Sequence, residues 1–147
     1  HNLIPFCIEI RKMGFKIKLD TNATNLSQIK KLLDLNLLDY IAIDFKAPSY
    51  KFKKIVGIDM YDNTIKTIQY LIKIDSNFEL RTTINKSLLD ENDINEMIKT
   101  ISKLGYKKTY YLQNFLETSS NIGNISKSSD IDKNKIDCQN LTIQYRN

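Results

Sequence analysis

A strand–helix–strand unit near the amino terminus places the tightest constraint on how this 147-residue chain can fold. Two short apolar segments end in the carboxylates of Asp20 and Asp44, and Leu26–Leu38 between them carries apolar residues at helical spacing. A helix that joins two strands in this way predicts a right-handed crossover between parallel strands. Because parallel strands end at one edge of a sheet, Asp20, Asp44 and Lys46 are expected to converge there. This is the edge where α/β folds bind their ligands.

Strands and helices alternate along most of the chain, which predicts an α/β fold with parallel strands and helical crossovers. Strands are expected over Phe15–Leu19, Tyr40–Phe45, Phe78–Ile84, Tyr106–Leu112 and Leu141–Tyr145. Helices are expected over Asn2–Met13, Leu26–Leu38, a stretch that starts at Asp62 or Asn63, and Asp90–Leu104. The lysine-rich Ser49–Asp59 follows Pro48 and is predicted as an irregular connection. The polar Thr118–Asn140 is predicted as loop with at most a marginal helix.

The composition argues against several classes of protein. Hydrophobic residues make up 41% of the chain, which is ordinary for a globular domain. No segment approaches the roughly 18 apolar residues of a membrane helix, and no leader suggests secretion, so a cytoplasmic protein is expected. The net charge of +5 is compatible with nucleic-acid binding, but the lysines are dispersed and arginine is scarce. The glycine-rich patterns of nucleotide-binding loops are absent as well.

The cysteines and the histidine predict no metal site. Cys7 and Cys138 are far apart and lack the spacing of zinc or iron–sulfur ligands. Cys7 lies on the apolar side of a helical pattern and is expected in the core. His1, the single histidine, is the first residue and therefore a poor candidate for a catalytic base.

Four segments carry a further signal through their order and spacing. They are Gly-Phe-Lys-Ile-Lys-Leu-Asp-Thr-Asn at 14–22, Asp-Tyr-Ile-Ala-Ile-Asp-Phe-Lys-Ala-Pro at 39–48, Leu-Arg-Thr-Thr at 80–83 and Tyr-Leu-Gln-Asn-Phe at 111–115. Together they resemble the radical S-adenosylmethionine activases of glycyl-radical enzymes. Within that family the resemblance is strongest to the activating proteins of anaerobic ribonucleoside-triphosphate reductases.

The resemblance implies a fold, a partial barrel of six parallel βα units. In the family a Cys-x-x-x-Cys-x-x-Cys loop after the first strand holds a [4Fe–4S] cluster, and neither that loop nor the Gly-Gly-Glu-Pro-like segment of the second strand occurs here. The chain is then expected to begin within the second helix of the family fold. Residues 1–117 would form the carboxyl-terminal part of the (βα)6 radical-SAM barrel, and residues 118–147 a polar extension with a possible final strand.

The resemblance also implies a site for S-adenosylmethionine. The expected cofactor-binding residues are Asp20, Thr21, Asn22, Asp44, Lys46, Arg81 and Gln113. Asp20 would lie beside the methionine end, with Asp44 and Lys46 lining the same site, and Gln113 would contact the nucleoside or an incoming peptide loop. In some relatives an alkali cation is held here, which implies Asp20, Thr21 and Asp44 as its oxygen ligands. Arg81 on a strand inside a barrel requires an anionic partner.

The activity implied for the intact enzyme is hydrogen abstraction from a glycine of a partner protein, by a 5′-deoxyadenosyl radical made from S-adenosylmethionine. The implied partner is a glycyl-radical enzyme, the anaerobic ribonucleoside-triphosphate reductase, with flavodoxin or ferredoxin as electron donor. Because the cluster ligands lie outside this chain, it is expected to be inactive alone.

Plainer interpretations of the same residues remain open. Asp20, Asn22 or Asn25 can cap the following helix, Asp44 and Lys46 can form a simple surface ion pair, and Arg81 can pair with Glu79. Tyr110 and Tyr111 are expected to pack rather than to carry a radical. Ala23 stands where the family has glycine, so a positive φ is expected elsewhere, at Asn22 for example.

The function has alternatives too. One is a pyruvate formate-lyase activating enzyme or another radical S-adenosylmethionine protein. Others are a non-redox α/β barrel that binds a small ligand, and a binding module without catalysis. Under the truncated-barrel hypothesis the strand at Lys16–Leu19 has an unpaired edge, which predicts a chain that aggregates or dimerises.

Overall fold

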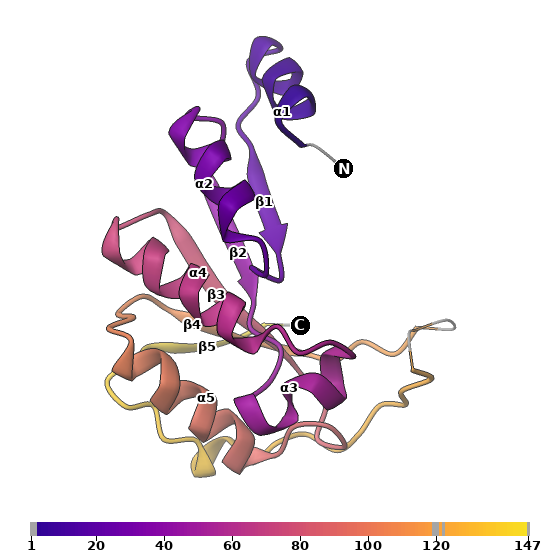
Figure 1. Cartoon of the computed structure of the whole chain (residues 1–147). Helices are drawn as coiled ribbons and strands as arrows, with labels where there is room; N and C mark the ends of the chain where they lie inside the picture. Colours follow the sequence, from indigo (N-terminus) through magenta and orange to yellow (C-terminus); the bar gives the residue numbers. More distant parts are fainter. Residues whose placement is uncertain (1–2, 119–120, 122, 147) are drawn as a thin grey trace.

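The computed structural model describes residues 3–118, 121 and 123–146, and within them five strands form one parallel sheet (Figure 1). The strands lie in chain order and are β1 (Lys18–Thr21), β2 (Tyr40–Asp44), β3 (Phe78–Ile84), β4 (Tyr110–Asn114) and β5 (Ile143–Arg146). The helices are α1 (Leu3–Lys12), α2 (Leu26–Asp34), α3 (Ser49–Val56), α4 (Tyr61–Lys73) and α5 (Glu91–Lys103), with a 3-10 turn, η1, at Lys133–Lys135. Every neighbouring pair of strands is parallel, which confirms the predicted fold class.

One face of the sheet carries the hydrophobic core. Helices α2, α4 and α5 lie along this face (Figure 1). The strands contribute Ile43, Leu80 and Leu112, and the helices contribute fully buried side chains such as Ile68 and Ile98. A smaller cluster under α1 contains Cys7, which is buried as predicted.

The other face of the sheet is mostly polar. Side chains alternate between the two faces of a strand, and the register places Asp20 of β1 beside Ala42 of β2 and Asp44 beside Arg81 of β3. The same alternation continues to Gln113 of β4. The residues on this face are Lys18, Asp20, Tyr40, Ala42, Asp44, Glu79, Arg81, Thr83, Tyr111, Gln113, Gln144 and Arg146. Charged side chains from four strands therefore face one another.

The prediction of an irregular connection over Ser49–Asp59 was wrong, because its first eight residues form α3. Phe52, Ile55 and Val56 have helical spacing, and Phe52 is buried. Because lysines separate these apolar residues, the short amphipathic pattern was not recognised in the sequence. Gly57 ends the helix with φ 85°, and its N–H donates to the Lys53 carbonyl at 2.9 Å.

The fourth strand begins later than predicted. Tyr106 lies before the strand, and its buried ring places the hydroxyl within 3.1 Å of the Leu80 N–H, which donates to it. The ladder with β3 starts only at Tyr110. The segment after Leu116 contains η1 and then β5, which pairs with β4 in the same sheet.

No helix within the described ranges is long and apolar enough to cross a membrane. His1 and the predicted helix start at Asn2 lie outside the described residues.

Candidate functional site

Arg81 joins two carboxylates at the carboxyl edge of the sheet. Its Nε donates to Asp44 Oδ1 at 2.5 Å, and its Nη2 donates to Asp20 Oδ2 at 2.9 Å. The Arg81 side chain is 15% exposed, whereas that of Asp20 is 52% exposed. The strand ends thus bring together three of the residues that the sequence assigned to one site.

Two lysines extend this ion-pair array on either side. Lys46 Nζ lies 3.4 Å from Asp44 Oδ2, and Lys18 Nζ lies 3.4 Å from Asp20 Oδ1. Both lysines are well exposed, so each of these outer pairs contributes at most about 1 kcal/mol to stability. The five charges alternate in sign along the edge and leave one excess positive charge. Such an edge can bind a zwitterion, because it offers carboxylates for an ammonium group and cations for a carboxylate.

The electrostatics of the site favour the charged forms of Asp20 and Arg81. Burial acts to raise the pKa of Asp20, but the hydrogen bond and charge of Arg81, with help from Lys18, outweigh it and leave the pKa below its ordinary value. Burial likewise acts to lower the pKa of Arg81, and hydrogen bonds to Asp44 and Asp20 outweigh it and raise the pKa.

The alternative pairing of Arg81 with Glu79 is not found. Glu79 is 4% exposed and receives hydrogen bonds from Arg146 at 3.0 and 3.2 Å and from the Tyr40 hydroxyl at 3.1 Å. Arg146 also stacks on the ring of Tyr111, with 3.3 Å from its Cζ to the ring centroid. Burial, followed by the nearby Glu79 charge, raises the pKa of Tyr40 to about 12. A second polar cluster thus lies on the same face, farther from the strand ends.

Asp20 does not cap the helix that follows β1, and the turn between them has a specific backbone conformation. Ala23 itself adopts the positive φ, 59°, so the expectation that another residue would take it was wrong. Two buried threonines of α4 hold the turn: Thr67 donates to the Ala23 carbonyl at 2.7 Å, and Thr64 donates to the Asn22 carbonyl at 3.1 Å. These contacts fix the backbone conformation that an alanine adopts with strain.

The helix cap comes from Asn25, whose side chain accepts a hydrogen bond from the Gln28 N–H at 3.1 Å. Asp20 is therefore left for the charged edge. Sequence analysis did not single out the two threonines of α4, although polar residues three positions apart on the buried face of a helix are a sign of a specific hydrogen-bonding role.

Of the residues predicted to bind an alkali cation, Asp20 and Asp44 lie on the polar face of the sheet, and Thr21 lies on the other face. Asp20 and Asp44 are bridged by Arg81. Thr21 projects to the opposite face of β1, and its hydroxyl accepts a hydrogen bond from the Ala23 N–H at 3.0 Å. The alkali cation stays a prediction.

A hollow of about 460 Å³ opens over the ends of β2 and β3. Predicted site residues in its wall are Asn22, Asp44, Lys46 and Arg81, and further wall residues include Thr83, Asn85 and Phe115. Gln113 lies beside Thr83 in the strand register, on the same face as Arg81. Thr83 could have been found from its position two residues after Arg81, which places both side chains on one face of the strand.

The described residues do not fit an iron–sulfur cluster. Cys7 is the buried cysteine of α1, and Cys138 is exposed and follows η1 in the sequence. Within the described ranges, no group of three or more His, Cys, Asp or Glu side chains is arranged to hold a metal ion.

Comparison with known proteins shows a related sequence and a related fold. No protein-family model matches the chain. Over 96 residues it is 34% identical to a protein of Methanocaldococcus jannaschii whose name assigns it, provisionally, as a glycyl-radical enzyme activating enzyme. The two chains are homologous over this region. The match covers 62% of this chain and 40% of the relative, so the chain spans less than half of the relative's length.

The fold is similar to a solved structure, a domain of pyruvate-formate lyase-activating enzyme from Bacteroides vulgatus. The TM-score is 0.70, with 97% of this chain and 88% of the other covered, at 12% identity. At that level of identity the likeness concerns the fold alone.

Proposed function

We propose that this chain is the S-adenosylmethionine-binding part of a radical activating enzyme for a glycyl-radical protein. The observation that carries the proposal is the Asp20–Arg81–Asp44 bridge at the carboxyl edge of the sheet, in a chain homologous to a protein named as such an activase. The [4Fe–4S] cluster would be held by residues outside this chain, since the described cysteines do not fit one.

The residues of the edge would bind and orient the cofactor. Asp20 and Asp44 would accept hydrogen bonds from its amino group, and Lys46 with Arg81 would neutralise its carboxylate. The existing ion pairs hold these side chains in place before the cofactor arrives, which lowers the entropic cost of binding. S-adenosylmethionine, when bound, supplies the adenosyl group for hydrogen abstraction; the protein contributes position and exclusion of water.

The finer proposal concerns partner and setting. We propose anaerobic ribonucleoside-triphosphate reductase as the glycyl-radical partner, a flavodoxin or ferredoxin as electron donor, and the cytoplasm as the location. The four motifs at 14–22, 39–48, 80–83 and 111–115 support this choice. An assay with purified reductase and with pyruvate formate-lyase as the competing substrate distinguishes the two activases, because the glycyl radical is detected by electron paramagnetic resonance on whichever protein is activated.

The test of the cofactor site uses the full-length gene product. Asp20→Ala and Lys46→Ala are expected to weaken S-adenosylmethionine binding at least about tenfold while cluster absorption stays unchanged, since each loses a charged contact. Asp34→Ala and Lys66→Ala remove exposed charges elsewhere and serve as controls. Full formation of 5′-deoxyadenosine by either site variant, at low cofactor concentration, would contradict that residue's role.

A sequence observation tests the class of enzyme. A Cys-x-x-x-Cys-x-x-Cys motif encoded about 50 to 60 residues upstream of His1 is expected if the chain belongs to a radical enzyme. Coding sequence of that length without the motif would instead favour the non-redox small-ligand barrel.

A further inference from the structure

Arg146 of β5 crosses a neighbouring strand to reach its partner. In the register it lies beside Gln113 of β4, yet its guanidinium group donates two hydrogen bonds to the carboxylate of Glu79 on β3, at 3.0 and 3.2 Å. Strand β4 lies between β3 and β5, so the side chain of Arg146 spans it. It does so over the ring of Tyr111, with 3.3 Å between its Cζ and the ring centroid. The stacked ring holds the guanidinium group against the sheet.

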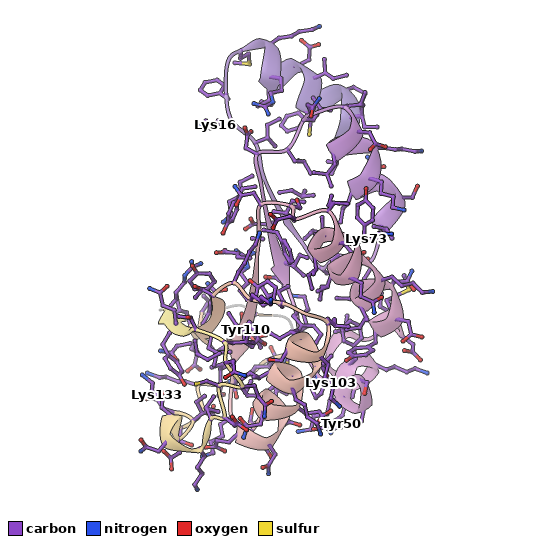
Figure 2. All side chains as sticks on the ribbon, turned by 90° about the vertical axis from the view of Figure 1, so that its left-hand side faces the viewer. Lys16, Tyr50, Lys73, Lys103, Tyr110 and Lys133 are labelled. Carbon is purple, nitrogen blue, oxygen red and sulfur yellow. The ribbon has the colours of Figure 1, made fainter. Side chains whose placement is uncertain are left out.

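The position of Tyr111 on the polar face follows from the alternation of side chains along β4. Its neighbour Tyr110 is fully buried in the interior of the molecule, where its hydroxyl group shares a hydrogen bond with that of Thr82 (Figure 2). Tyr111 therefore points to the polar face, and in the register it lies beside Arg81. The guanidinium group of Arg146 thus lies over the strand that is next to Arg81.

Glu79 requires a counter-ion. It is 4% exposed, so water cannot compensate the charge of its carboxylate. Among the described residues of the polar face, the cations are Lys18, Arg81 and Arg146. Lys18 lies on β1, two strands away from β3, and is paired with Asp20 at 3.4 Å. Arg81 follows Glu79 by two residues on the same face of β3, within reach of a side chain as long as that of arginine. Without Arg146, Arg81 would be the nearest cation to Glu79.

We propose that Arg146 is a positioning residue of the candidate site, because it neutralises Glu79 and so leaves Arg81 free to bridge Asp20 and Asp44. The bridge uses Nε and Nη2 of Arg81, and these donors cannot serve Glu79 at the same time. Loss of the charge of Arg146 would draw Arg81 to the buried carboxylate and leave the two aspartates without their shared donor. Arg146 would therefore act through Arg81 rather than on the cofactor. The position of Arg81 does not depend on the proposed function, whereas the expected effect on S-adenosylmethionine rests on it.

The first test measures whether Arg81 still supports Asp44, by urea denaturation of the full-length gene product. Asp44→Asn is expected to lower the unfolding midpoint of the otherwise unmodified protein, since it weakens the contact with Arg81. In an Arg146→Gln background the same change should lower the midpoint by less than about half as much, because Arg81 would already have moved to Glu79. In the Glu79→Gln/Arg146→Gln background no buried charge attracts Arg81, so the full effect of Asp44→Asn should return. Arg146→Lys keeps the positive charge and should also keep the full effect.

The second test measures binding of S-adenosylmethionine to the same full-length variants by equilibrium dialysis. Arg146→Gln is expected to weaken binding at least about fivefold, since the aspartates lose their orientation. Glu79→Gln/Arg146→Gln should restore the affinity to within about twofold of the unmodified protein. Lys133→Gln is the matched control, because Lys133 also lies over a tyrosine ring of β5, that of Tyr145 at 4.2 Å, and it should change neither readout.

The two tests separate this inference from the proposed function. Equal effects of Asp44→Asn in all backgrounds, or a loss in the Glu79→Gln/Arg146→Gln protein as large as in Arg146→Gln, would overturn the positioning role. A reduced effect of Asp44→Asn in Arg146→Gln with unaltered cofactor binding would support the positioning of Arg81 and contradict the cofactor site instead.

Discussion

At the scale of single residues, the site depends on which face of its strand each side chain takes. Carboxylates at strand ends could be placed from the sequence, because parallel strands end at one edge and alternation fixes the face. The partner of Arg81 could not be predicted from the sequence, because Glu79 on the same strand and face was also a candidate. The strand register determines the partner of Arg81. Arg81 lies beside Asp44, whereas Glu79 lies two residues earlier on β3 and accepts a hydrogen bond from Arg146.

The bridging role of Arg81 predicts a loss of stability when it is removed. Arg81→Leu leaves Asp44 and Asp20 without their shared hydrogen-bond donor and should lower the free energy of unfolding by about 1–3 kcal/mol in urea denaturation. Arg11→Leu removes a more exposed arginine, 3.1 Å from Asp39, and should cost less than about 1 kcal/mol. Equal losses would show that the bridge is no stronger than a surface ion pair.

The buried threonine beneath the strand-end turn carries a second prediction. Thr67→Val keeps the shape of the side chain but leaves the Ala23 carbonyl without its hydrogen bond, which should destabilise the fold by about 1–2 kcal/mol. Thr142→Val, at an exposed position, is the control and should change the midpoint of thermal unfolding little. A neutral Thr67→Val would mean that the turn holds its conformation without help from α4.

At the scale of elements, long periodic segments were predictable and short or polar ones were not. The helices α2, α4 and α5 and the strands β2 and β3 have runs of apolar residues at regular spacing, and the capping box of Asp90 and Asp93 marks the start of α5. In α3, eight residues contain too few apolar positions to stand out among lysines. The segment before β5 is positioned by contacts to α5 that no local pattern encodes, such as the Asp132 N–H donating to Glu91 at 2.7 Å.

Glu91 links the segment before β5 to α5, and protonation of its carboxyl group should lower the stability of the fold at acid pH. The hydrogen bonds from the Asp132 N–H and from Lys86 lower the pKa of Glu91 to about 2. A carboxyl group with a lowered pKa stabilises the fold fully above its ordinary value of 4.5, and this stabilisation is lost as the pH falls toward 2. Glu91→Gln should therefore flatten the fall in the unfolding midpoint between about pH 4.5 and 2.

The control for this measurement is Glu96→Gln on the same helix. Among the described residues Glu96 makes a single ion pair, with Lys99 at 3.6 Å on the exposed surface. Its replacement should leave the acid limb of the stability curve like that of the unmodified chain. An unmodified slope in Glu91→Gln would mean that the contact with Asp132 does not persist in solution.

At the scale of the whole molecule, the alternation of strands and helices was enough to predict a parallel sheet in chain order. It was not enough to predict that one face of this sheet is polar across all five strands. A parallel sheet is usually apolar on both faces, whereas here Tyr40 and Asp44 of β2 lie on the polar face. The polar residues of that face are widely separated in the sequence, and only the register brings them together.

The edge at β1 leads to a prediction about the chain as a whole. Strand β1 pairs only with β2 among the described strands, and close to it in the sequence Phe6, Met13 and Phe15 are more than half exposed. An open strand edge beside apolar side chains promotes association with another copy, and Lys16 and Lys18 oppose this only by charge. We expect the chain to self-associate at micromolar concentration in sedimentation velocity. Phe15→Ser should shift it toward monomer, whereas Ile58→Ser, a similarly exposed apolar position in the connection between α3 and α4, should not. A monomer for the unmodified chain at all concentrations would show that the lysines protect the edge sufficiently.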